Sequence, residues 1–296
     1  MEGIPPEVAK YSVPRATSET GKKGMLALKL AGDQASGRTV VREQYSQVPL
    51  FAQKPMYLEE SLQSMAYMYI ISPSGGILQG DEYRIDISLA GNAQAHLTTQ
   101  GATRIYKMDE GFAAQQVDIT VDGGCYLEYM PDQIIPYAGS RFYQKTDLRV
   151  HENATVVYSE IISPGRAASG ELFQYDVCYL RIRGSDLHGN LKFADTAVLE
   201  PKAGDARALG LLEQDVVAAV YVMAPLKLVP DLNKLANAAL ADMKIRGGAS
   251  ILPNNCGIAI RMLGGYADDL QKAAGKIAEI TRKLVLDAPF TKMRKG

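Results

Sequence analysis

Tyr83-Arg84-Ile85-Asp86-Ile87-Ser88-Leu89 alternates apolar and polar side chains at every step. Successive side chains of a β-strand point to opposite faces, so this alternation predicts a strand with one buried and one exposed face. Similar short runs occur on both sides of it, at residues 26–30, 93–97 and 117–121. The sequence therefore predicts a chain that is built mainly of short β-strands.

Turn signals separate these runs. They are Gly91-Asn92, Asp122-Gly123-Gly124, Glu152-Asn153 and His188-Gly189-Asn190. Gly, Asn and Asp favour tight turns, and their recurrence favours many short antiparallel strands. No strict repeat demands a regular solenoid. We therefore expect a mainly β fold that is either β-helix-like or made of irregular stacked sheets.

Two helices are expected near the C-terminus. Apolar residues recur at helical spacing over residues 231–243 and again over residues 267–287. Between them, residues 249–263 predict two strands about the turn Pro253-Asn254-Asn255. No linker divides the chain, so we expect one large β-rich domain over residues 23–296, preceded by a flexible N-terminal arm over residues 1–22.

Composition excludes several classes of protein. The chain has 296 residues, of which 47% are apolar, so a sizeable core is expected. Its net charge of −1 gives no electrostatic reason to expect nucleic acid or a membrane as partner. Three separated cysteines form neither a disulfide framework nor a zinc box, which favours reduced thiols in the cytoplasm. Three scattered histidines make a preformed metal site improbable, and we expect His96 at the surface or in a groove.

Three carboxylates interrupt apolar strands: Glu128, Glu160 and Asp176. Simple alternation favours an orientation toward solvent for each of them. If two faced each other, they could bind a divalent ion, or act as the acid and base of a carbohydrate-active β-solenoid hydrolase. Such enzymes usually present aromatic platforms, and a chain without tryptophan is a poor candidate for that alternative.

Four further segments stand out: Gly75-Gly76-Ile77-Leu78-Gln79-Gly80-Asp81, Thr98–Tyr106, Pro131–Ser140 and Gly165–Glu171. None of them is a nucleophile elbow, a phosphate loop or a metal box. The first predicts a glycine turn that Asp81 could cap. The last predicts a loop whose charges form a salt bridge or whose surface binds a partner. We expect the hydroxyls of Thr98, Thr99 and Thr103 to form hydrogen bonds with neighbouring residues.

In order and in type, these segments resemble the urease accessory protein family called UreD or UreH. The matching positions are Gly76, Gly80, Asp81, Thr98, Thr99, Thr103, Tyr106, Pro131, Pro136, Ser140, Arg166, Gly170 and Glu171. The resemblance covers roughly residues 24–290. It implies a β-rich fold with two late helices, and a protein that is not an enzyme.

The resemblance also implies a role as chaperone and scaffold in urease maturation. Such a protein binds apo-urease and the helical partner UreF, which recruits the GTPase UreG carrying nickel. It holds no tight cofactor, but Ni²⁺ passes through it transiently along a water-filled route. Because a relay must release its cargo, we expect oxygen groups along that route. Our candidates are Asp81, Glu160, Glu171, Thr99 and Thr103.

A scaffold for several proteins must expose apolar surface that its partners cover. An apolar run is formed by Met65, Tyr67, Met68, Tyr69 and Ile70. We therefore expect this run to contribute to a partner-binding surface.

Overall fold

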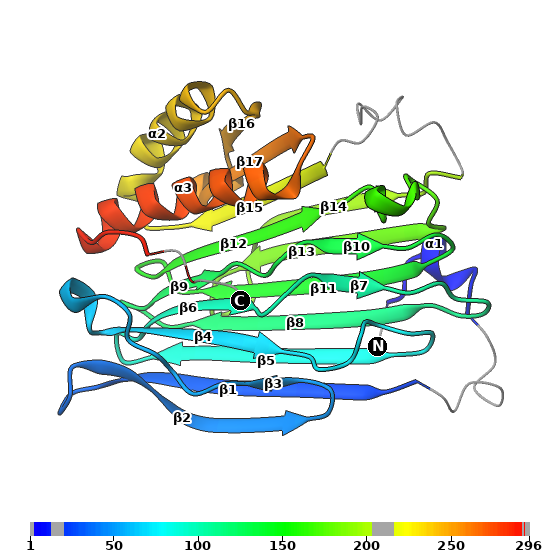
Figure 1. The fold of residues 1–296 in the computed structure, drawn as a ribbon. Helices are drawn as coiled ribbons and strands as arrows, with labels where there is room; N and C mark the ends of the chain where they lie inside the picture. Colours follow the sequence, from blue (N-terminus) through cyan, green and yellow to red (C-terminus); the bar gives the residue numbers. More distant parts are fainter. Residues whose placement is uncertain (1–2, 13–20, 203–215, 292, 294–296) are drawn as a thin grey trace.

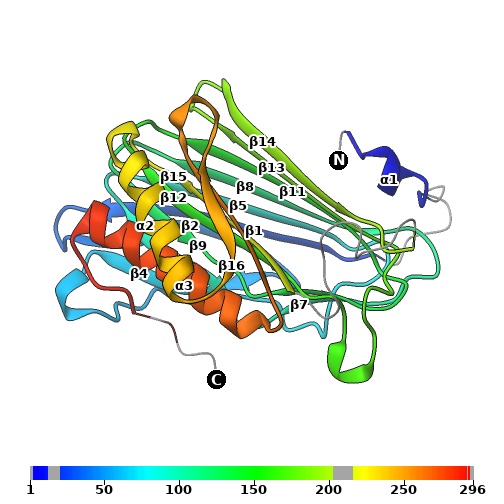
Figure 2. The same cartoon turned by 90° about the horizontal axis from the view of Figure 1, so that it is seen from above.

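The computed structural model describes residues 3–12, 21–202, 216–291 and 293. Strands make up 46% of the described residues, which confirms the mainly β prediction. Two large sheets lie face to face, and two helices cover part of one sheet (Figures 1 and 2).

The elements follow one another along the chain in this order: α1 (Pro6–Ala9), β1 (Lys23–Asp33), β2 (Arg38–Gln47), β3 (Phe51–Ala52), β4 (Met65–Ile71), β5 (Glu82–Ala90), β6 (Gln94–Thr99), β7 (Thr103–Ile105), β8 (Ala113–Val121), β9 (Tyr126–Tyr129), β10 (Ile134–Pro136), β11 (Arg141–Val150), β12 (Thr155–Ile162), β13 (Val177–Ser185), β14 (Leu191–Leu199), β15 (Val216–Met223), α2 (Val229–Asp242), β16 (Arg246–Ile251), β17 (Gly257–Gly264) and α3 (Ala267–Leu286). Short 3₁₀ turns lie at Glu60–Leu62, Ala167–Ser169, Leu226–Leu228 and Pro253–Asn255.

The two sheets are built by alternate strands of a coiled chain. Sheet A has the order β14-β13-β11-β8-β5-β1-β2, and sheet B has the order β16-β17-β15-β12-β9-β6-β4-β3. Within sheet A, β1, β5, β8, β11 and β13 are mutually parallel neighbours. Within sheet B, β4, β6, β9 and β12 are likewise parallel. Each coil therefore places one strand in sheet B and the next in sheet A, which makes a solenoid-like stack (Figure 1).

The prediction of antiparallel strands is wrong for this central stack. Antiparallel pairs occur at its two ends, as in β1–β2, β13–β14 and β15–β17. The turn signal His188-Gly189-Asn190 does join an antiparallel pair, β13 and β14. The earlier signals Gly91-Asn92 and Glu152-Asn153 instead carry the chain from sheet A to sheet B. A tight turn fixes a reversal of direction, but it does not fix which strand becomes the neighbour.

Sheet B is buried on both faces in its central part. One core cluster fills the space between the sheets, and a second fills the space between sheet B and the two late helices. All eight residues of β12 are buried as a result. In β4, Met65, Tyr67 and Met68 are completely buried, so the expectation that this run exposes a partner surface is wrong. Strands covered on both sides lose the alternation of a half-exposed strand.

The late helices and the hairpin between them match the prediction. Helix α3 begins after Tyr266, carries Asp268 and Asp269 in its first turn, and ends at Asp287, whose φ of 49° is left-handed. Acidic residues at a helix N-terminus interact favourably with the helix dipole. Strands β16 and β17 pair antiparallel about residues 253–255. Among the described residues, no helix is both long and apolar enough to cross a bilayer.

The N-terminal segment, for which the sequence predicted a flexible arm, has a packed part. Val8 of α1 is completely buried against a small apolar cluster on sheet A that includes Tyr143 and Val177. The guanidinium of Arg141 lies 4.5 Å from the ring centroid of Tyr11. Residues 1–2 and 13–20 of the predicted arm lie outside the described residues.

Candidate functional site

The four motif segments lie at one end of the stack. They form the long turns of successive coils, at residues 72–81, 100–112, 130–140 and 163–176, which lead from sheet B to sheet A. Strands β7 and β10 pair in parallel within these turns, and Ile77 forms a parallel bridge with Ile105. The motifs are thus brought together by stacking, although they are separated by about thirty residues along the chain.

Aromatic rings hold these turns together. The rings of Tyr106 and Tyr137 meet edge to face with their centroids 5.0 Å apart, and the Arg166 guanidinium lies 4.4 Å from the Tyr137 ring centroid. A Cβ atom at Gly76 would lie 2.5 Å from the Tyr106 ring. A side chain at position 76 is therefore excluded by the neighbouring coil, which explains the glycine in the motif.

Asp81 caps the glycine turn, as the sequence suggested. Its carboxylate accepts hydrogen bonds from the backbone N–H of Lys22 (2.8 Å) and of Leu78 (2.9 Å), and from the hydroxyl of Tyr83 (3.2 Å). The side chain is 1% exposed. These contacts tie the turn to the chain entering β1.

Glu171 and Arg166 form an ion pair on the outside of the stack. The Arg166 Nε donates to Glu171 at 2.9 Å, and the backbone N–H of Ala138 donates to the same carboxylate at 3.2 Å. Both contacts lower the pKa of Glu171, with the Arg166 hydrogen bond contributing most. The predicted salt bridge is confirmed, and it lies within one long turn, while the bond from Ala138 connects that turn to the preceding one.

The motif threonines satisfy backbone groups. Thr98 donates to the carbonyl of Met130 at 2.7 Å. Thr99 donates to the carbonyl of Gly101 at 2.9 Å and accepts from the backbone N–H of Asp132 at 2.8 Å. These bonds connect the end of β6 to the turn that follows β9.

A cavity of about 360 Å³ lies beside these turns, between the two sheets. The polar side chains in its wall include Thr99, Thr103, Gln115, Asp132, Gln144, Tyr158 and Glu160. Three of the five candidates for a nickel route, Glu160, Thr99 and Thr103, therefore line one space. Asp81 and Glu171 are not among its lining residues; Asp81 caps a turn, and Glu171 lies on the outside.

Glu160 is the most buried carboxylate in the wall of this cavity. It accepts a hydrogen bond of 2.6 Å from the hydroxyl of Tyr158 and one of 2.7 Å from the amide of Gln144. Burial raises the pKa of Glu160, because desolvation disfavours the charged form. Within the described part of the chain, no three His, Cys, Asp or Glu side chains converge to hold a metal ion.

The expected orientation toward solvent is wrong for Glu128 and Glu160. Glu128 is completely buried and Glu160 is 7% exposed, so neither faces solvent. They lie on opposite faces of sheet B, because Glu128 bonds to α3 whereas Glu160 bonds to β11 in sheet A. Asp176 lies apart from both, in ion pairs with Arg141 and Lys202. No two of them face each other, which contradicts the paired-carboxylate hydrolase alternative.

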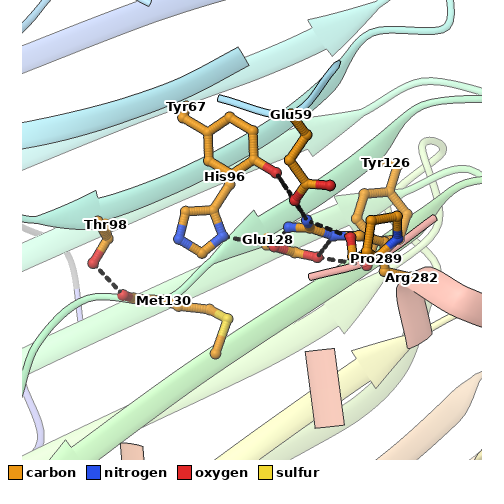
Figure 3. A network of polar contacts seen from close by, with 9 residues as sticks. All are labelled: Glu59, Tyr67, His96, Thr98, Tyr126, Glu128, Met130, Arg282 and Pro289. Atoms are coloured by element: carbon orange, nitrogen blue, oxygen red, sulfur yellow. Dashed lines mark hydrogen bonds and ion pairs between the residues drawn. The ribbon is translucent and has the colours of Figure 1, made fainter. Parts of the chain in front are cut away.

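A buried charged network that the sequence analysis did not predict lies on the face of sheet B that α3 covers (Figure 3). Arg282 of α3 donates to Glu128 at 2.6 and 3.0 Å and to Glu59 at 3.0 Å. The Nδ1 atom of His96 lies 2.6 Å from Glu128, and His96 is 5% exposed, so it is not a surface residue; the expected groove position agrees with its place in the wall of a hollow beside α3. Tyr67 completes the network through its hydroxyl.

One signal could have revealed this network. Tyr126-Leu127-Glu128-Tyr129 shows no alternation, which is typical of a strand buried on both faces. A carboxylate inside such a strand must be buried and paired. The partner Arg282 could not be identified, because nothing in its helical spacing distinguishes a buried arginine from a solvated one.

Comparison with known proteins agrees with the family resemblance that the motifs indicated. The UreD urease accessory protein family matches residues 22–296. A urease accessory protein UreD of Cenarchaeum symbiosum (strain A) is 41% identical over 278 residues, which cover 93% of this chain and 97% of that protein. Urease accessory protein UreD 2 of Brucella canis is 36% identical and covers 97% of each chain, and that of Streptomyces griseus is 33% identical over 95% and 96%.

These relatives align over more than nine-tenths of each chain, and their shared description is that of an accessory protein. The stacked motif turns described above lie within the matched region. The chain therefore belongs to the UreD urease accessory protein family, whose members are accessory proteins and not catalytic enzymes.

Proposed function

We propose that this chain is a scaffold for urease maturation, which binds apo-urease and the UreF–UreG pair and passes Ni²⁺ toward the urease active site. The observation that carries the nickel step is the polar cavity between the sheets, where Glu160, Thr99 and Thr103 meet beside the family-motif turns. We place this activity in the cytoplasm, where the three free cysteines would stay reduced.

The polar groups of the cavity are suited to binding a metal ion transiently. Oxygen ligands of the carboxylate, hydroxyl and amide type hold a divalent ion less tightly than a cage of thiolates and imidazoles. Burial raises the pKa of Glu160, and a carboxylate with a higher pKa is subject to stronger competition from protons when it binds a cation. A site that binds and releases Ni²⁺ in this way is better suited to passing the ion on than to storing it.

Partner binding needs exposed apolar surface, and the structure offers it away from β4. Val48 is 80% exposed, Tyr266 is 76% exposed and Leu226 is 65% exposed. These side chains lie in separate segments of the chain, and we propose that partner proteins cover them in the complex.

The test is complementation in cells that express urease with its other accessory proteins but lack this chain. At limiting nickel, we expect urease purified from these cells to be poor in nickel and activity. Supplying the chain should restore both, and a tagged copy should recover urease and UreF together. Full nickel loading without the chain would contradict the proposal.

A further inference from the structure

One end of the outer face of sheet A carries a row of apolar side chains. Tyr143 of β11 lies opposite Ala114 of β8 and Tyr179 of β13, and residues that lie opposite each other point to the same face. The rings of Tyr143 and Tyr179 meet edge to face with their centroids 5.5 Å apart. On these three strands the face then changes from apolar to polar within two residues. The next row consists of Gln116, Lys145 and Arg181.

The chain covers this apolar row with its own N-terminal segment. We call residues 3–12 the strap. The backbone N–H groups of residues 8–12 donate to carbonyls three or four residues earlier, which winds this part of the strap into helical turns. Ile4, Val8 and Tyr11 recur at a spacing of four and three residues, and all three pack in one cluster with the apolar row. Figures 1 and 2 show α1, the centre of the strap, beside this end of sheet A.

Two charged residues of sheet A hold the end of the strap. The Nζ atom of Lys10 lies 2.5 Å from the carboxylate of Glu200, which directly follows β14. The guanidinium of Arg141 lies 4.5 Å from the ring centroid of Tyr11. The sheet therefore recognises three chemical features of the strap in order: an apolar side chain at position 8, a cation at position 10 and an aromatic ring at position 11.

The strap is attached to the stack without being part of it. It adds no strand to either sheet. Of its ten residues only Val8 is buried, whereas Ala9, Lys10 and Ser12 are exposed. The match to the UreD family begins at residue 22, so the strands that form the apolar row lie inside the matched region and the strap lies outside it. A contact that depends on one buried side chain can be exchanged for another ligand with the same features.

We propose that the apolar row, together with Arg141 and Glu200, is a docking site for a segment of a partner protein, and that the strap is an intramolecular ligand that blocks it. The partner segment has the pattern of the strap: an apolar residue, a basic residue two positions later and an aromatic residue next to it. Helical peptides bind apolar surfaces through anchors of this kind. The inference rests on the proposed scaffold function for the existence of the partner, and it adds how access to one binding site is regulated.

A fluorescent peptide of residues 3–12 tests the site, with binding to the full chain followed by anisotropy. Val8→Asp should release the strap, because it would bury an unpaired carboxylate. The peptide should bind this variant with a dissociation constant on the order of 0.1 mM. In the wild type the tethered strap has an effective concentration in the millimolar range, so the peptide should bind at least about tenfold more weakly. Ala9→Asp is the matched control at an exposed position of the strap, and it should behave like the wild type.

A charge exchange tests whether the peptide is recognised at the proposed contacts. A Lys10→Glu peptide should bind the Val8→Asp protein about threefold more weakly, which is the scale of an exposed ion pair. Adding Glu200→Lys to that protein should reverse the preference. Val8 lies outside both sheets, and circular dichroism checks that each variant keeps the spectrum of the wild type. Lack of saturable binding to Val8→Asp, equal binding to Val8→Asp and wild type, or a preference that Glu200→Lys does not reverse would overturn the proposal.

The blocking role is tested in the complementation cells described above, at limiting expression of the tagged chain. Val8→Asp should recover more urease and UreF per tagged copy than Ala9→Asp, and added peptide should lower the recovery by Val8→Asp. Equal recovery by the two variants, or recovery that the peptide leaves unchanged, would overturn the proposal. The peptide assay uses the chain alone, so the docking site can fail while complementation succeeds, and the reverse.

Discussion

Arg282 and Glu128 are 154 positions apart in the sequence and form a two-point ion pair without any solvent exposure of either side chain. The pair fastens the last helix to the middle of sheet B. Glu59, from the segment before β4, shares the same guanidinium at 3.0 Å. Three distant parts of the chain are therefore joined through one buried cation.

Arg282→Met should destabilise the protein by about 3–5 kcal/mol, because it leaves buried carboxylates without their counter-charge. The free energy of unfolding in urea measures this effect. Lys272→Met on the same helix is the matched control: Lys272 is 55% exposed and pairs with Asp268 and Asp269, so its loss should change stability by about 0.5 kcal/mol or less. Equal changes in the free energy of unfolding for the two substitutions would show that the buried pair contributes no more to stability than an exposed pair.

Acid should weaken the network in a defined direction. The pKa of Glu128 in the folded protein is lowered below its ordinary value of 4.5. Its contribution to stability is therefore present above the unfolded value and is lost as the pH falls through the folded value. The difference in unfolding free energy between wild type and Glu128→Gln should be constant above about pH 5 and shrink below it.

The control for this pH series is Glu82→Gln, at an exposed position at the start of β5. Its difference from wild type should stay close to zero throughout. A Glu128→Gln difference that does not change down to about pH 3 would mean that Glu128 gains nothing from its ionised partners.

The motif glycine at position 76 should be needed for stacking of the coils. In Gly76→Ala, the new methyl group would overlap the Tyr106 ring and lie 2.7 Å from the Arg104 carbonyl. Overpacking of this kind costs about 1–3 kcal/mol. Gly101→Ala is the control, since its Cβ would have nothing within 4 Å. Thermal unfolding of both variants compares them, and an unaltered Gly76→Ala protein would count against the stacking account.

Local patterns predicted the elements well, for reasons visible in particular residues. The spacing of Leu270, Ala274 and Ile277 marks the buried stripe of α3, and all three are buried. Alternation in Tyr83 to Leu89 marks β5, whose apolar positions are buried. These patterns depend only on the geometry of a single helix or strand.

Contacts between residues that are distant in the sequence could not be predicted in the same way. The turn at Gly91-Asn92 looks like a hairpin turn, yet it sends the chain to the opposite sheet. Burial of Glu128 and His96 depends on α3, which follows them by more than a hundred residues. The candidate site was recovered in part: Glu160, Thr99 and Thr103 share a cavity, whereas Asp81 and Glu171 have their own structural contacts.

The central claim is that the cavity between the sheets conducts nickel to urease, and one comparison tests it most directly. Urease activity at limiting nickel should be measured in cells carrying Glu160→Gln or Glu171→Gln, and normalised to the complex recovered by pull-down. Glu160 lines the cavity and Glu171 does not, although both belong to the original candidates. We predict that Glu160→Gln lowers normalised activity by about tenfold, the scale expected for loss of a metal-site group, while Glu171→Gln stays close to wild type. Normalised activity equal to wild type in both variants would contradict a nickel route through this cavity.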